Sequence, residues 1–164
     1  MRMELIQPFI NAADAVLCES LQSPTKIADV TMDDEAYRRK GVAAMIHIVG
    51  DIEGRVIFDL DTATAVKIAG FFSGGPVEAT DDLVKDTVCE LANQVIGNAI
   101  TTLNDQGMHF RVSPPIIHTA ETGGKSSEDT EALVMCFDTP NGRVYMNISV
   151  RYHRRRRTEK VVTV

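Results

Sequence analysis

Apolar residues recur at helical spacing near the start of the chain. The positions that share this spacing are Phe9, Ile10, Ala13, Val16 and Leu17. Such a stripe is typical of a helix that buries one face. Pro8 suits the first turn of a helix, where its missing N–H has no partner to lose. The pattern therefore predicts a helix from Pro8 to about Leu21.

Strand-like patterns follow this helix. After a Ser-Pro break, residues 27–32 are expected to form a short strand. Two further apolar runs, residues 41–49 and 54–60, flank a glycine-containing segment at residues 50–54. Two such runs joined by a short turn-forming segment are typical of a β-hairpin.

The middle of the chain returns to helical spacing. Asp61 is placed to cap a helix over residues 62–72, and the Ser-Gly-Gly-Pro run at residues 73–76 ends it. A longer helix is expected over residues 82–103, with Asp81 or Thr80 as its cap. Its apolar stripe consists of Val84, Val88, Leu91, Val95 and Ala99.

The remainder of the chain is predicted to form strands. They cover residues 110–112, 116–120, 132–137 and 143–152, with a loop at 123–127 and a Pro-Asn-Gly turn at 140–142. Apolar and polar residues alternate along the last strand, as in a sheet with one covered face. The expected fold is an α/β protein of the α+β type, with a mixed, largely antiparallel sheet and long helices packed on one face.

Short matches within the chain suggest an internal duplication. Residues 4–7 (Glu-Leu-Ile-Gln) resemble residues 90–93 (Glu-Leu-Ala-Asn), which lie 86 positions later. Residues 54–56 and 142–144 are both Gly-Arg-Val, at an offset of 88. Similar offsets favour two pseudo-repeated halves, although matches this short also arise by chance.

Composition indicates one globular domain. Of the 164 residues, 44% are hydrophobic and 24% charged, and the net charge of −6 argues against a nucleic-acid-binding surface. No stretch resembles a membrane span or a secretory signal, so we expect a cytoplasmic protein without membrane contact. Residues 1–152 are expected to form the domain, and residues 153–164 a basic tail that begins His-Arg-Arg-Arg-Arg.

Residue types that bind metals are scattered along the chain. The three cysteines, Cys18, Cys89 and Cys136, include no CxxC pair, and the four histidines lack the spacing of metal ligands. Motifs for nucleotide binding, zinc proteolysis and serine hydrolysis are also absent from the sequence. No metal site and no cofactor belonging to this chain are predicted.

The long helix carries a polar stripe opposite Val95. Its members, at positions i, i+4, i+7 and i+11 of one face, are Asp86, Glu90, Asn93 and Gly97. The simplest interpretation is the solvated side of an amphipathic helix, with the apolar side packed on the sheet and Glu90 and Asn93 exposed. However, Asn is unfavourable inside a helix, and Gly costs about 1 kcal/mol relative to Ala. Two such residues on one face favour a docking surface.

This stripe resembles the active-site motif of the CheC, CheX and FliY family of phosphatases. The matching residues are Asp86, Glu90 and Asn93, with Pro114 or Pro115 downstream. Residues 6–10 and 90–99 look like segments of the CheX-like members in particular, and the resemblance spans residues 3–152. The two prolines are separated from Asn93 by 20 and 21 intervening residues. This is a little short of the family spacing, and the basic tail has no counterpart.

The resemblance implies a hydrolase that removes the phosphoryl group from the aspartate of a CheY-like response regulator, in bacterial chemotaxis or related two-component signalling. Glu90 would pair with a lysine beside the phosphorylated aspartate, and Asn93 would orient the attacking water through its amide. Asp86 and Gly97 are candidate partner contacts. Mg²⁺ would be carried by the partner, and a homodimer with joined sheets is implied.

Several alternatives stay open on the sequence alone. Glu90 as a general base is one, although an exposed glutamate is a weak base. The whole chain could instead be a non-enzymatic module that binds a response regulator, or a structural dimerisation domain. Gly97 could serve tight packing within its own fold. Because Pro8 is expected to begin the first helix, Glu4 is placed outside it and forms no second pair with Gln7, which leaves one site per chain.

Overall fold

The computed structural model describes residues 2–33, 41–119 and 132–153. These residues form three helices, α1 (Met3–Leu21), α2 (Thr62–Ser73) and α3 (Asp82–Asp105). The strands are β1 (Lys26–Asp33), β2 (Val42–Gly50), β3 (Ile52–Leu60), β4 (Phe110–Val112), β5 (Ile116–Thr119), β6 (Ala132–Thr139) and β7 (Gly142–Tyr152). The predicted loop at 123–127, the end of the strand predicted at 116–120 and the tail from residue 154 lie outside the described residues.

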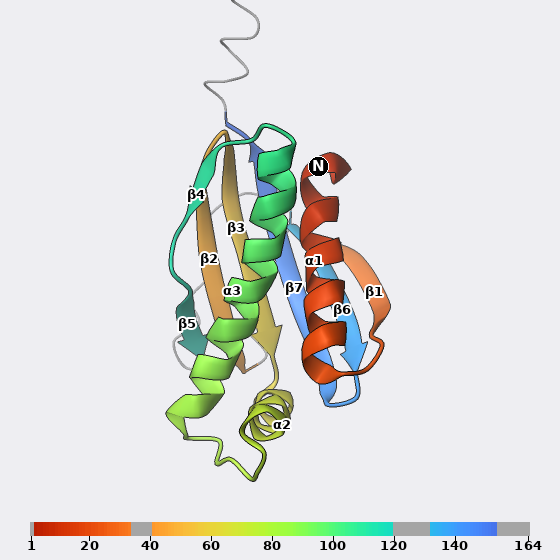
Figure 1. The fold of residues 1–164 in the computed structure, drawn as a ribbon, viewed down its shortest axis with the longest axis vertical. Helices are drawn as coiled ribbons and strands as arrows, with labels where there is room; N and C mark the ends of the chain where they lie inside the picture. Colours follow the sequence, from red (N-terminus) through yellow and green to blue (C-terminus); the bar gives the residue numbers. More distant parts are fainter. Residues whose placement is uncertain (1, 34–40, 120–131, 154–164) are drawn as a thin grey trace, which may run out of the picture.

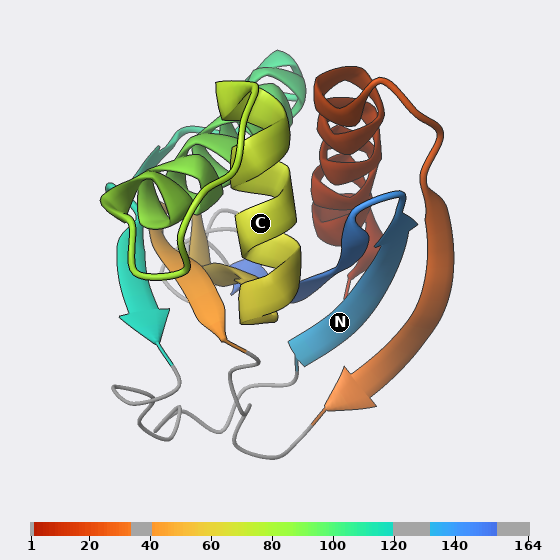
Figure 2. The ribbon, with the colours of Figure 1, turned by 90° about the horizontal axis from the view of Figure 1, so that it is seen from below.

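The strands form one seven-stranded sheet in the order β1-β6-β7-β3-β2-β4, in which β5 also pairs with β2. Every described pair of strands is antiparallel. All three helices lie on the same face of this sheet, as Figures 1 and 2 show. The predicted α+β class with helices on one face is therefore confirmed, and the described sheet is antiparallel throughout rather than mixed.

The fold is built from two related halves. In this comparison β1 corresponds to the β4–β5 segment, β2 to β6, and β3 to β7. When corresponding strands are exchanged, the strand order read from the opposite edge of the sheet is the same. The buried positions of α1 and α3 also correspond at an offset of 86 residues: Leu5 with Leu91, Phe9 with Val95, Ala13 with Ala99, and Leu17 with Leu103. Among the described elements, α2 is the one without a counterpart.

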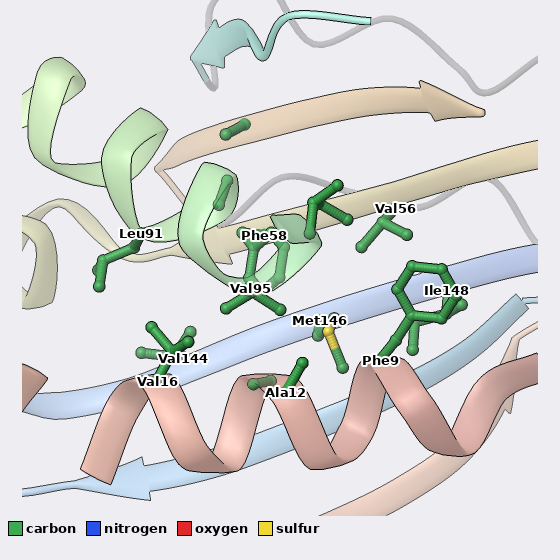
Figure 3. Close-up of a cluster of buried hydrophobic side chains, with 14 of the residues drawn as sticks. Phe9, Ala12, Val16, Val56, Phe58, Leu91, Val95, Val144, Met146 and Ile148 are labelled. Carbon is green, nitrogen blue, oxygen red and sulfur yellow. The ribbon is translucent and has the colours of Figure 1, made fainter. Parts of the chain in front are cut away.

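The core lies between the sheet and the pair formed by α1 and α3. These helices pack side by side, and their apolar stripes meet over the middle strands (Figure 3). Phe9 of α1 and Val95 of α3 are 0% and 1% exposed, and Met146 of β7 lies beneath them. A side chain of this kind contributes about 1.5–3 kcal/mol when it is fully buried. The core therefore holds both long helices in fixed orientations.

The start of α1 differs from the prediction. The helix begins at Met3, so Glu4 and Gln7 both lie within it, and Pro8 is inside the helix rather than at its start. Leu5 and Ile6 are 1% and 0% exposed, and burying them requires the helix to continue towards the N-terminus. Their burial offsets the one backbone hydrogen bond that Pro8 cannot donate. The expectation that Glu4 lies outside the helix was wrong.

The short helix α2 stands on one end of the sheet. Its predicted cap is confirmed, because the Asp61 side chain accepts a hydrogen bond from the Thr64 backbone N–H at 2.7 Å. Gly142, which begins β7 directly after the turn from β6, has a φ of 132°, and a Cβ atom there would collide with the Thr64 side chain. Glycine is therefore required where this turn meets α2. The helix ends at Gly74, within the predicted breaker run.

Among the described residues, a buried amide on the other face of the sheet has no hydrogen-bond partner. Asn147 is 1% exposed, and neither its side-chain nitrogen nor its side-chain oxygen is bonded. Its neighbours in the adjacent strands are Ile57 of β3 and Val134 of β6. A buried polar group without a partner costs roughly 1–3 kcal/mol.

We therefore expect Asn147→Leu to raise the free energy of unfolding by about 1–3 kcal/mol, because leucine has a similar volume and no polar atom to desolvate. Denaturant unfolding followed by circular dichroism measures this. The comparison variant Asn147→Asp, which places a charge at the same site, should lower stability. An unchanged or lower stability of Asn147→Leu would mean that the amide is satisfied in solution.

Candidate active site

The helix α3 is oriented by its cap and its apolar stripe. The Asp81 side chain accepts a hydrogen bond from the Leu83 backbone N–H at 2.9 Å, which begins the helix at Asp82 as predicted. The residues of the apolar stripe are almost fully buried: Val84 and Val88 are 1% exposed, Leu91 4% and Val95 1%. The opposite side of α3 is therefore turned outward from the core.

That outward side carries the polar stripe. Asp86, Glu90, Asn93 and Gly97 are all exposed, which confirms the expected exposure of the Glu90 and Asn93 side chains. Residues three apart on a helix have Cβ atoms about 5–6 Å from each other. A carboxylate and an amide are thus presented side by side, on a rigid element, to whatever molecule approaches this face.

A short chain of hydrogen bonds holds Glu90. The Gln94 side-chain amide donates to the Glu90 carboxylate at 3.1 Å, and the Ser20 hydroxyl donates to the Gln94 carbonyl oxygen at 3.4 Å. Ser20 lies near the end of α1, so this chain connects the two long helices. We did not predict these roles from the sequence. The spacing i, i+4 from Glu90 could have indicated Gln94, whereas Ser20 is brought to the site only by helix packing.

The Asn93 amide is not engaged in this way. Among the described residues, no hydrogen bond to the Asn93 side chain is present. Cys89, one turn before Asn93, is partly buried. Burial raises the pKa of its thiol, and the nearby Asp86 carboxylate raises this pKa further by a smaller amount. The Cys89 thiol is therefore not an activated nucleophile. Asn93 remains the group on this face whose donors and acceptor are free to bind water.

Gly97 lies in open space. A Cβ atom built at this position would have no neighbour within 4 Å. Tight packing within its own fold, the alternative considered from the sequence, is therefore not the reason for glycine here. Asp86 is also exposed, one turn before Glu90.

The two prolines of the sequence motif lie between β4 and β5. They connect β4 to β5, and β5 contacts α3 (Figure 1). Pro114 is exposed and Pro115 half-buried.

The position on α1 that corresponds to the Glu90 and Asn93 pair carries Glu4 and Gln7. Glu4 and Gln7 form an i, i+3 pair like Glu90 and Asn93, so the reason given for a single site was wrong. However, the Glu4 carboxylate accepts a hydrogen bond from the Tyr152 hydroxyl at 2.9 Å and lies 3.4 Å from the Arg2 guanidinium. The Gln7 amide donates to the Asn11 side chain at 2.9 Å. Both members of this second pair are thus engaged within the chain.

An open groove of about 590 Å³ runs between this part of α1 and the end of α3. Its polar lining residues include Glu4, Gln7, Asn11, Asn98, Thr101 and Gln106.

In the described part of the chain, no three His, Cys, Asp or Glu side chains are grouped so that they could hold a metal ion. None of the helices in the described ranges is long and apolar enough to span a bilayer.

The class of protein follows from two features: an antiparallel sheet of two related halves, and an exposed Glu-x-x-Asn pair on the long helix that covers it. Comparison with family models agrees with this. The model described as "Chemotaxis phosphatase CheX" matches residues 42–138, which is more than half of the chain and includes Glu90 and Asn93. The chain belongs to this CheX family.

Individual relatives are similar in sequence and in fold. The CheY-P phosphatase CheX of Thermotoga maritima is 30% identical over 77 residues, which are 46% of this chain and 50% of that protein. The chain thus spans about half the length of this relative. A CheC-like superfamily protein from Shewanella sp. PV-4 has a TM-score of 0.79 at 25% identity, with 92% of this chain and 99% of that chain covered.

A third related structure is that of a complex. In the crystal structure of the CheX-CheY-BeF3-Mg²⁺ complex from Borrelia burgdorferi, one chain matches this protein with a TM-score of 0.73 and 29% identity. The match covers 92% of this chain and 99% of that chain.

The open surroundings of Gly97 lead to a stability prediction. Gly97→Ala should raise the free energy of unfolding by about 0.5–1 kcal/mol, because alanine favours the helix and its methyl group meets no neighbour. Gly142→Ala, at a site where a Cβ collides with Thr64, should lower it. Chemical unfolding of both variants tests this. A loss of stability in Gly97→Ala would mean that this face of α3 is packed in solution.

Proposed function

We propose that this chain hydrolyses the aspartyl phosphate of a CheY-type response regulator and so ends the signal in bacterial chemotaxis or a related two-component system. The observation that carries the proposal is the exposed, unbonded Asn93 amide one turn from an oriented Glu90. Membership of the CheX family and the named activity of the Thermotoga maritima relative support it. A module that only bound its partner would not require an amide free to bind water.

Asn93 positions the attacking water. In the reaction the water oxygen forms a bond to phosphorus, the bond between phosphorus and the aspartate oxygen breaks, and inorganic phosphate and a free carboxylate result. The loose transition state of phosphoryl transfer depends on alignment and charge stabilisation more than on a strong base. An amide supplies alignment without a change of charge, because its oxygen accepts a hydrogen bond and its nitrogen donates.

Glu90 docks the partner. Its carboxylate is exposed and oriented by Gln94, so it is placed to pair with a lysine beside the phosphorylated aspartate, as the family resemblance implies. Charge-assisted hydrogen bonds of this kind fix orientation as well as affinity. Asp86, one turn earlier, and Gly97, one turn beyond Asn93, are the proposed further contacts with the partner.

Mg²⁺ enters with the partner in this proposal. The carboxylates of Asp86 and Glu90 are not part of any three-residue metal-binding group in the described residues. The complex solved from Borrelia burgdorferi joins its CheX to CheY together with BeF3 and Mg²⁺. This chain would therefore contribute the docking carboxylate and the water-positioning amide, while the partner brings the phosphoryl group and its metal.

The proposal also includes a cytoplasmic homodimer, with residues 1–152 as the phosphatase domain and residues 153–164 as a tail. The family resemblance implies that the sheets of two subunits join. In the described sheet the outer strands are β1 on one side and β4 with β5 on the other. Edge strands pair readily with a second chain, so these are the places where such a junction would form.

Replacing the amide should separate binding from turnover. We expect Asn93→Ala to slow phosphate release by at least about tenfold while binding of the phosphorylated regulator changes little, because the loss falls on the transition state. Candidate regulators would be phosphorylated with a small phosphodonor and their decay followed with native and variant protein. The matched control is Gln7→Ala on α1, which should leave decay unchanged. If native protein binds a phosphorylated regulator without accelerating its decay, the chain is a binding module.

Replacing the carboxylate should act on binding. We expect Glu90→Ala to weaken capture of a regulator activated with beryllium fluoride by about 5- to 150-fold, or roughly 1–3 kcal/mol. The free energy of unfolding should barely change, because the side chain is exposed. Titration calorimetry measures the first quantity and denaturant unfolding the second. Glu4→Ala serves as the control for binding, and an equal loss of affinity in that variant would assign docking to α1 instead.

A further inference from the structure

The two related helices differ at the residue one turn after the amide. On α1 the Gln7 side chain donates to Asn11 at 2.9 Å, which is an i, i+4 pair. At the offset of 86 that relates the helices, Asn93 corresponds to Gln7 and Gly97 to Asn11. The position that captures the amide on α1 is thus occupied on α3 by a residue without a side chain.

In the described residues, none of the other neighbours of Asn93 on α3 makes a hydrogen bond with its amide. Glu90, at i−3, is instead bonded to Gln94. Cys89, at i−4, offers a partly buried thiol, which is a weak hydrogen-bonding group. Ile96, at i+3, is buried and apolar. Position 97 is therefore the place on this face where a side chain equivalent to Asn11 would bond to Asn93 along the helix.

We propose that Gly97 is a positioning residue: by lacking a side chain it keeps the Asn93 amide free of an i, i+4 hydrogen bond, so that the amide is available to the attacking water. This inference rests on the proposed function and assigns Gly97 a role beyond partner contact. A glycine in mid-helix is unfavourable by about 1 kcal/mol, and nothing in the described fold requires it for packing. The free amide is the feature that the glycine preserves.

The test compares two side chains of similar length at this position. Gly97→Gln introduces the i, i+4 amide pair seen on α1, in which the later residue accepts. Gly97→Met has similar size, but its thioether is only a weak acceptor and cannot donate a hydrogen bond. Both variants add bulk to the docking face, so both should raise KM for the phosphorylated regulator. Only Gly97→Gln should also lower kcat, by at least about fivefold relative to Gly97→Met, because its side chain would bind the Asn93 amide that positions the water.

A second readout does not depend on activity. In NMR spectra of the protein alone, the side-chain NH2 signals of Asn93 should show ps–ns mobility in the native chain and in Gly97→Met. In Gly97→Gln the same signals should become ordered, like those of Gln7. Asn11→Gly on α1 is the control: it should mobilise the Gln7 amide and leave phosphate release unchanged.

The outcomes separate this inference from the proposed function. If native protein accelerates decay and Gly97→Gln and Gly97→Met have equal kcat, Gly97 serves partner approach alone and the inference is wrong. An ordered Asn93 amide in the native chain would also overturn it. If no regulator decays faster with native protein, the proposed function fails, whatever the mobility of Asn93.

Discussion

The packing of two apolar helix stripes against one face of the sheet is the interaction on which the rest of the structure depends. Phe9 of α1 and Val95 of α3 both lie in the core between the helices and the sheet and are almost fully buried (Figure 3). Because the buried side of α3 is fixed by this core, its opposite side is fixed as well. The exposure of Glu90 and Asn93 is therefore a direct consequence of hydrophobic packing.

Similar backbones carry different chemistry in the two halves. Glu4 on α1 is held by Tyr152 and Arg2, and Glu90 on α3 is held by Gln94. The Gln7 amide donates to Asn11, whereas the Asn93 side chain has no hydrogen bond among the described residues. These side-chain hydrogen bonds do not alter the backbone of α1 or α3. The strand order and the buried positions preserve the symmetry of the fold, and the exposed side chains break it. One half can thus present a site while the other half closes the equivalent position with internal hydrogen bonds.

Much of the fold could be predicted because its signals are local. The caps at Asp61 and Asp81 and the apolar stripe of α3 depend on residues within a few positions of each other, and the structure contains each of them. The start of α1 could not be predicted in the same way. Pro8 gives a strong local signal for a helix start, and the burial of Leu5 against the sheet overrides it. Local rules fail where distant packing supplies the larger free energy.

By itself the sequence determined the class of fold, the orientation of α3 and the residues of the candidate site, because helical periodicity alone places Glu90 and Asn93 on one exposed face. Only the tertiary structure decided how the carboxylates of Glu4 and Glu90 are held. The bond from Tyr152 to Glu4 and that from Ser20 to Gln94 join residues 148 and 74 positions apart. Such contacts exist only once the strands and helices are packed, so no spacing along the chain encodes them.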